Sequence, residues 1–246
     1  MPPELSVVIP AYNEERRLPD TLRRVRAYLE GRGISAEVIV VDDGSQDGTA
    51  ALVENLRAGF SGLRLVSNGR NRGKGYSVRH GMLEARGRIV LFTDADLSAP
   101  IEEAEKLLAP IHRGYEVAIG SRGVDRSLIE VHQSPLRELA GIIFNRIVRV
   151  VTGLDFVDTQ CGFKAFVREP ARIVFEQQRI ERFGFDPEIL FLAKRHGLRA
   201  VEIPVRWAHH PHTKLNVLRD SLRMFWEVLS IRWNWLLGRY PKRRPG

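Results

Sequence analysis

Two aspartates separated by a single residue, Asp94 and Asp96, are the side chains in this sequence that most directly suggest chemistry. In an extended chain alternate side chains point to the same side, so both carboxylates can face one cation. Mg²⁺ and Mn²⁺ prefer oxygen ligands and are typically held by one or two carboxylates together with substrate phosphates. Ser98 lies one alternation further on and is a third candidate ligand. The pattern predicts a divalent metal site; the alternative is a loop of acids that caps the helix begun by Pro100.

A second acidic segment, residues 42–45, reads Asp-Asp-Gly-Ser and follows another apolar run. A carboxylate in this position is suited to accept hydrogen bonds from a base N–H or a ribose hydroxyl. Tyr12, which follows the first apolar run, can stack on that base. Asp, Gly and Ser are also common turn formers, so the residues alone leave a plain strand-ending turn as the alternative.

A glycine-rich segment spans residues 69–75 and carries Lys74. Its glycine spacing is one residue shorter than that of a phosphate-binding P-loop, and Gly75 stands where the P-loop has Ser or Thr. The segment is therefore not a P-loop. Lys74 nevertheless stands at the expected start of a helix, where free amides and the helix dipole favour an anion.

Short apolar runs that alternate with helical patterns must position these residues. The expected strands are 5–10, 37–41, 64–66, 88–93 and 116–120, and the expected helices lie near 15–31, 47–58, 75–86 and 101–113. This alternation predicts an α/β fold with a mostly parallel central sheet covered by helices. Ligands of such sheets bind beyond the carboxyl ends of the strands, where the acidic segments fall.

The second half of the chain is less regular. We expect an amphipathic helix over 136–152, a loop that ends at 161–164, and a helix capped by Asp186 with Pro187 at its first position. A chain of 246 residues with 43% hydrophobic content can bury one core, which predicts one main domain over 1–207. An amphipathic helix over 208–238 and a basic tail over 239–246 follow it.

Net charge and cysteine content restrict the possible binding partners and the cellular compartment. The net charge of +8 favours anionic partners. The single cysteine, Cys161, cannot form an internal disulfide, and the first residues show no signal-peptide pattern. The sequence therefore predicts a cytoplasmic protein.

The last helix has an apolar stripe with arginines on the surrounding faces, and these charges interrupt the roughly 20 apolar residues that a membrane span needs. Tryptophan and arginine together suit the headgroup boundary, which predicts a helix that lies on the membrane. The alternatives are a helix packed on the core or against a second copy in a homo-oligomer. The stripe comprises Leu215, Leu218, Leu222, Phe225, Leu229, Trp233 and Leu236, with Trp226 and Trp235 beside it.

In this order the motifs resemble the family 2 glycosyltransferases, and specifically the dolichyl-phosphate β-glucosyltransferase branch. The resemblance runs from about Leu5 to Trp233 and rests on residues 7–15, 40–45, 71–75, 94–96, 120–122 and 158–164. The last of these reads Asp-Thr-Gln-Cys-Gly-Phe-Lys, and with residues 181–186 it is more similar to glucosyl than to mannosyl enzymes.

The resemblance implies a GT-A-type nucleotide-binding fold, a nucleotide-sugar donor and Mg²⁺ or Mn²⁺. Asp94 and Asp96 would contact donor and metal, Ser98 would lie near the metal, and Arg122 near the phosphates or the sugar. Related mannosyltransferases often carry Gln where Ser98 stands. The residues expected around the donor are Pro10, Ala11, Tyr12, Glu14, Val41, Asp43, Lys74 and Ala95.

The implied reaction is inverting transfer of glucose from UDP-glucose to a dolichyl or undecaprenyl phosphate at the cytoplasmic face of a membrane. A phosphate monoester is already largely anionic at neutral pH and needs little help from a base. We therefore expect Asp96 and Arg122 to stabilise the negative charge of the phosphate groups. Asp158 stands at the family-like position of a catalytic carboxylate, where positioning is favoured over proton abstraction; a structural loop acid is the alternative. The candidates for the acceptor phosphate are Arg137, Lys164 and Lys214.

Other functions remain as alternatives. A mannosyltransferase using GDP-mannose, or a transferase with a soluble or polysaccharide acceptor, would share the same fold. A basic module that binds nucleic acid without catalysis is disfavoured, because the sequence has no zinc, RNA-recognition or helix-turn-helix signature and its acids cluster where phosphates would be repelled. We expect no nucleic-acid partner.

Overall fold

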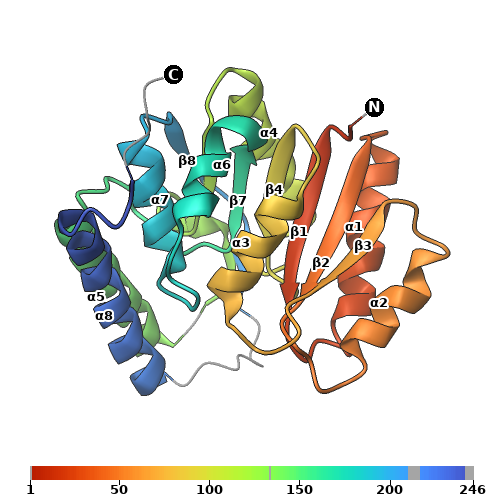
Figure 1. The fold of residues 1–246 in the computed structure, drawn as a ribbon, viewed down its shortest axis with the longest axis horizontal. Coiled ribbons are helices and arrows are strands. Elements are labelled where there is room, and N and C mark those ends of the chain that lie inside the picture. Colours follow the sequence, from red (N-terminus) through yellow and green to blue (C-terminus); the bar gives the residue numbers. More distant parts are fainter. Residues whose placement is uncertain (1, 133, 210–216, 242–246) are drawn as a thin grey trace.

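A computed structural model describes residues 2–132, 134–209 and 217–241; the side chains of 135–137 and 217–221 are outside the description. A seven-stranded sheet in the order β3-β2-β1-β4-β7-β5-β8 organises the molecule (Figure 1). Its strands are β1 Leu5–Ala11, β2 Ala36–Asp42, β3 Leu63–Ser67, β4 Ile89–Thr93, β5 Val117–Ser121, β7 Phe163–Val167 and β8 Ala200–Pro204.

Strands β1 to β4 pair in parallel, as the alternation of strands and helices predicts. Successive side chains of β1 enter opposite layers of the core: Val7 and Ile9 lie in one hydrophobic cluster and Val8 in the other. The first layer is covered by α1 Leu18–Gly31, α2 Thr49–Arg57 and α4 Ala104–His112, and the second by α3 Lys74–Glu84, α6 Arg168–Gln177 and α7 Phe185–Arg195.

One interior strand of the sheet, β7, was not predicted from the sequence. Phe163 and Lys164, expected in a loop, begin β7, which runs antiparallel between β4 and β5. The start of β7 therefore lies beside the end of β4, with Thr93 opposite Phe163. The strand β8, which completes the sheet beyond β5, was also not expected.

The start of α7 differs from the expected cap. The helix begins at Phe185 after Gly184, so Asp186 lies within the first turn and Pro187 is not the first helical residue. The Asp186 carboxylate does not cap the helix, because it is paired with the buried Lys164 ammonium at 2.5 Å. An ion pair formed across the fold has replaced the local cap.

Two long helices form a side layer beyond α7: α5 Pro135–Thr152 and α8 Val217–Leu236 pack together (Figure 1). The expectation of a helix over 136–152 is confirmed, and Gly153, whose φ of 69° suits glycine, caps the C-terminal end of α5. A small sheet pairs β6 Ile129–Val131 with β9 Trp207–Ala208, and 3₁₀ turns cover Ile101–Glu103 and Arg126–Leu128. No helix in the described ranges has the length and apolar character to cross a bilayer.

Candidate active site

The predicted site residues meet at one edge of the sheet, where the parallel strands have their carboxyl ends. Tyr12 follows β1, Asp94 follows β4 and Arg122 follows β5. Lys74 is the first residue of α3, and Asp158 lies in the loop that leads to β7. The prediction that acidic segments gather at this edge is therefore confirmed.

Lys74 and Asp94 form an ion pair, with 2.5 Å between Nζ and Oδ1. Burial disfavours the charged form of Lys74, but the attraction of Asp94 and then Asp186 outweighs it and raises the lysine pKa. Gly162 lies directly against Asp94: a Cβ added there would be 2.2 Å from the aspartate Oδ2. The glycine of the 158–164 motif is thus required for the carboxylate to reach this position.

Asp96 is less tightly paired than Asp94, although its side chain is the less exposed of the two, at 24% against 32%. Its Oδ2 lies 4.0 Å from the Arg17 guanidinium, and its Oδ1 accepts a hydrogen bond from the Ser98 amide at 3.0 Å. Leu97, between these two residues, has a φ of 47°, a left-handed conformation that costs free energy for a branched side chain. The strained turn holds Asp96 outward, with the Ser98 backbone as its support.

The described residues contain no cluster of three or more His, Cys, Asp or Glu side chains that would hold a metal unaided. Asp96, with Asp94 close by but paired to Lys74, offers only part of a coordination sphere. That donor set fits a hard cation which takes its remaining oxygens from a ligand's phosphates and from water.

Asp43 has a role that the prediction of a nucleotide contact missed. One oxygen accepts from the Asn68 side chain at 2.8 Å and from the Arg72 amide at 2.9 Å, and the other accepts from the Gly73 amide at 2.8 Å. Both oxygens of this buried carboxylate hold the glycine-rich segment. Asp43 thereby fixes the loop that delivers Lys74 to Asp94.

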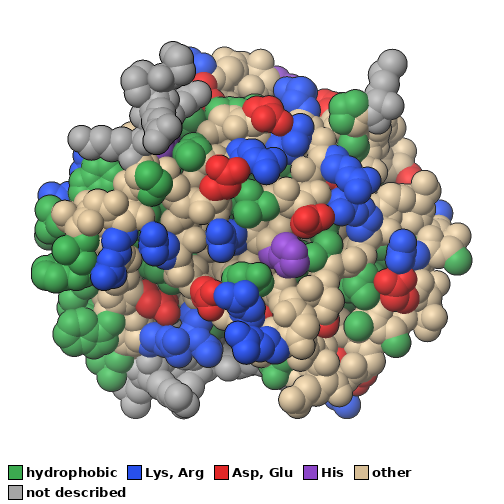
Figure 2. Space-filling model, viewed as in Figure 1, with side chains coloured by type: hydrophobic (Ala, Val, Ile, Leu, Met, Phe, Trp, Pro, Cys, Tyr) green, Lys and Arg blue, Asp and Glu red, His purple; other side chains and the backbone are tan. Residues whose placement is uncertain are grey.

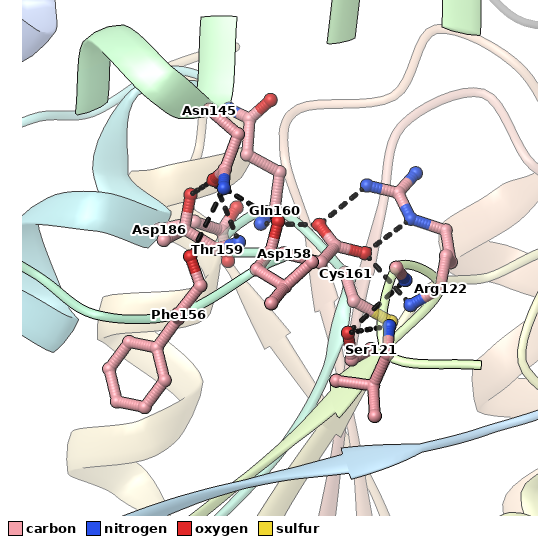
Figure 3. A network of polar contacts seen from close by, with 12 residues as sticks. Ser121, Arg122, Asn145, Phe156, Asp158, Thr159, Gln160, Cys161 and Asp186 are labelled. Atoms are coloured by element: carbon pink, nitrogen blue, oxygen red, sulfur yellow. Dashed lines mark hydrogen bonds and ion pairs between the residues drawn. The ribbon is translucent and has the colours of Figure 1, made fainter. Parts of the chain in front are cut away.

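Arg122 and Asp158 form a two-pronged ion pair (Figure 3). Nε lies 2.6 Å from Oδ2 and Nη2 lies 2.8 Å from Oδ1, while the backbone amides of Arg122 and Gln160 donate to the same carboxylate. Burial disfavours the ionised carboxyl, but the Arg122 charge and these hydrogen bonds outweigh it and lower the Asp158 pKa to about 2. So weakly basic a carboxylate is suited to holding an arginine and poorly suited to accepting a proton.

The loop that carries Asp158 is fixed by two residues that sequence reasoning missed. Asn145 of α5 donates to the carbonyls of Phe156 and Val157 and accepts from Thr159 (Figure 3). Glu202 of β8 accepts from the amides of Val157 and Asp158. Neither residue belongs to a recognisable motif, and only their distant partners reveal their function.

The prediction that Lys164 contacts the acceptor phosphate is wrong for this structure. Its side chain is fully buried, and its ammonium donates to the Cys161 carbonyl and pairs with Asp186, both at 2.5 Å. Because β7 pairs with β4 and β5, the Lys164 side chain faces the interior of the protein. An unpaired charge there would destabilise the fold. Lys214 and the side chain of Arg137 lie outside the described residues.

The remaining predicted donor residues are distributed along the same edge. Pro10 and Ala11 end β1, with Pro10 in register with Val41 of β2. The Ala95 carbonyl accepts a 2.5 Å hydrogen bond from the Thr21 hydroxyl, and Glu14 pairs with Arg17 at 3.0 Å. Their contact with a donor stays a prediction.

Solved structures share this fold. Mannosyl-3-phosphoglycerate synthase from Rubrobacter xylanophilus matches with a TM-score of 0.66 at 23% identity, over 99% of this chain and 77% of that one. Glucosyl-3-phosphoglycerate synthase from Mycobacterium tuberculosis, in complex with Mn²⁺, UDP-glucose and phosphoglyceric acid, matches with 0.66 at 22% identity, over 99% and 82%. At these identities the likeness supports the fold alone, and it confirms the predicted α/β glycosyltransferase architecture.

Relatives found by sequence have a higher identity to this chain than these solved structures. The dolichyl-phosphate beta-glucosyltransferase of Drosophila melanogaster is 40% identical over 248 residues, which is 96% of this chain and 76% of that protein. The human enzyme of the same name is 36% identical with the same coverage. One from Trichomonas vaginalis is 36% identical over 221 residues, covering 85% of this chain and 65% of its own length.

The model of the family described as "Glycosyl transferase family 2" matches residues 6–174, a segment that contains the Lys74–Asp94 pair, Asp96 and the Arg122–Asp158 pair. The resemblance seen in the motifs is therefore confirmed, and the chain is a glycosyltransferase that belongs to glycosyl transferase family 2.

Proposed function

We propose that this enzyme transfers glucose from UDP-glucose to a dolichyl or undecaprenyl phosphate and inverts the anomeric configuration, giving a polyprenyl β-glucosyl phosphate. The names of its sequence relatives support the acceptor and the sugar. The observation that carries the proposal is the clamped Arg122 guanidinium at the same sheet edge as Asp94 and Asp96. A fixed cation at the same sheet edge as a candidate metal site can offset the repulsion between two phosphate-bearing substrates.

Mg²⁺ or Mn²⁺ is the proposed cofactor, with Asp96 as its protein ligand and Asp94 beside it. Structures of glucosyl-3-phosphoglycerate synthase contain Mn²⁺ or Mg²⁺ together with UDP, which supports divalent metal use in this fold. When bound, the ion would compensate the negative charge that develops on the departing diphosphate. In the proposal Ser98 orients Asp96 through its amide.

The chain's own residues then align the acceptor. A polyprenyl phosphate is ionised without a general base, so its need is for positive charge in a fixed place. Arg122 uses Nε and Nη2 on Asp158, and among the described residues no hydrogen bond engages its remaining N–H groups, which can donate to a phosphate oxygen. Asp158 is thus a positioning residue, and Lys74 adds positive charge next to Asp94 on the donor side.

A membrane surface is the proposed partner of α8. Trp226 is 67% exposed and Trp233 61%, and Leu222 and Leu236 are exposed with them. Trp235, expected beside the stripe, packs its ring edge-on against Phe191, with 5.7 Å between the ring centroids. The exposed row, together with Leu139 and Ile143 of α5, offers an apolar face for the headgroup boundary. Location on the cytoplasmic face of a membrane stays a prediction.

The decisive experiment offers the purified protein a short polyprenyl phosphate in detergent with Mg²⁺ and, in parallel, UDP-glucose or GDP-mannose. We expect a glucosylated lipid of β configuration from UDP-glucose alone. A mannosylated lipid formed from GDP-mannose would show that the proposed donor is wrong. Transfer only to soluble acceptors would show that a polyprenyl phosphate is not the acceptor.

Membrane docking is tested by vesicle co-sedimentation. Replacing Trp226 and Trp233 with Ser should reduce binding while the circular dichroism of the fold is unchanged, since both rings face outward. Undiminished binding of this double variant would exclude α8 as the contact.

A further inference from the structure

A groove of about 670 Å³ lies outside the predicted donor site. Three segments form it: the loop after β3, the loop between α6 and α7, and the first turns of α8. None of the residues predicted to bind the donor lines it. Figure 2 shows lysine and arginine side chains gathered on the lower part of this face of the molecule. The groove is lined by Arg70, Arg72, Arg179, Arg182 and Arg223.

The arginines of the groove outnumber its carboxylates. Glu181 pairs with Arg72 at 2.5 Å, and Glu227 pairs with Arg223 at 3.3 Å. Neither Arg70 nor Arg182 has a carboxylate partner among the residues that the structure describes. The groove therefore keeps an excess of positive charge that its own glutamates do not neutralise.

Close backbone packing fixes the shape of the groove. Gly73, with a φ of 112°, leaves room for the Glu181 carbonyl, which would lie 2.5 Å from an added Cβ. The Arg72 guanidinium sits 3.5 Å above the Tyr76 ring, and Arg179 donates to the Arg239 carbonyl at 2.9 Å. These contacts order the Arg72 and Arg179 side chains before any ligand arrives, which lowers the entropic cost of binding an anion there.

The groove adjoins the exposed row of α8. Arg223 follows Leu222 directly and lies three residues before Trp226, which is one helical turn. A membrane that contacts the apolar face would bring its headgroups to the rim where the arginines stand. Arginine forks match phosphate oxygens in pairs, and the excess of arginines over carboxylates suits an anionic headgroup.

We propose that this arginine groove binds the phosphodiester headgroup of an acidic phospholipid when α5 and α8 dock on the membrane. The inference rests on the proposed membrane-surface function and deepens it, because it names the lipid class that orients the enzyme. It also separates two anion sites: the groove for a resident lipid, and Arg122 for the reacting phosphate.

The test compares vesicles of phosphatidylcholine with and without phosphatidylglycerol. The variant R70Q/R182Q removes the two arginines without carboxylate partners, and R86Q/R113Q is the matched control. It removes the same charge from exposed arginines that precede β4 and β5 at the opposite edge of the sheet. Each arginine at an acidic surface contributes about 1 kcal/mol, so R70Q/R182Q should bind phosphatidylglycerol vesicles about 30-fold more weakly. The control variant R86Q/R113Q should lose much less of this vesicle binding. If both variants lost vesicle binding equally, the effect would come from the net charge of the protein and not from the groove, and the proposal would be overturned.

Two further measurements separate this inference from the proposed function. In detergent without acidic lipid, R70Q/R182Q should match the wild type in UDP-glucose binding and in KM for polyprenyl phosphate. Weaker UDP-glucose binding would assign the groove to the donor, a higher KM would assign it to the acceptor, and either result overturns the inference. A wild type that binds phosphatidylglycerol through the groove but transfers no sugar would refute the proposed function and support the groove.

Discussion

Replacing Asp158 with Asn tests whether this carboxylate positions Arg122 or takes a proton. The substitution places an amide donor against a guanidinium that now donates at 2.6 and 2.8 Å. The Asp158 pKa is lowered from 3.8 to about 2. The folded protein therefore stabilises the ionised carboxylate by about 2 to 3 kcal/mol, and the neutral Asn side chain would lose this stabilisation. For a domain of this size we expect the melting temperature to fall by roughly 5 to 10 °C.

The assay is sugar transfer from UDP-glucose to polyprenyl phosphate across neutral pH. If Asp158 only positions Arg122, D158N should keep measurable transfer, reduced about 10- to 100-fold, with an unchanged pH profile. R122K, which cannot make the paired contacts, should cost a similar factor, and the double variant R122K/D158N little more. An acid limb of kcat in the wild type that disappears in D158N would refute this reasoning, as would complete loss of transfer in a D158N protein that is still folded at the assay temperature.

Three further outcomes are expected. Asp96→Ala should abolish transfer and the Mn²⁺-dependent part of UDP-glucose binding measured by calorimetry, and normal transfer would remove Asp96 from the metal site. Gly162→Ala should destabilise the protein by about 1 to 3 kcal/mol in urea and impair transfer, because the new Cβ would meet Asp94 at 2.2 Å, whereas Gly141→Ala in α5 meets nothing within 4 Å and serves as control. Glu188 is fully buried; burial raises its pKa from 4.5 to about 7 despite a hydrogen bond from Tyr240. A carboxyl with a raised pKa stabilises the fold most below its unfolded pKa and loses that contribution as the pH rises through the folded one. The wild-type melting temperature should therefore fall between about pH 5 and pH 8 more than that of Glu188→Gln, and equal pH dependence would contradict this assignment.

Local patterns in the sequence determined much of this protein. The period of the apolar runs predicts β1 to β5 and the helices between them, because alternation and helical periodicity are properties of neighbouring residues. The same patterns place Asp94, Asp96 and Arg122 at strand ends, and parallel strands carry their ends to one edge. The motifs were sufficient to identify the family.

Only the tertiary structure decided how those residues are used. Lys164 was expected to face a phosphate, but the insertion of β7 between β4 and β5 buries it against Asp186. The arginine groove likewise depends on partners far apart in the chain, such as Arg72 and Glu181, which are 109 residues apart. No local spacing encodes such contacts, because they form only when whole elements pack, and burial then determines whether a charged side chain meets a ligand or pairs within the fold.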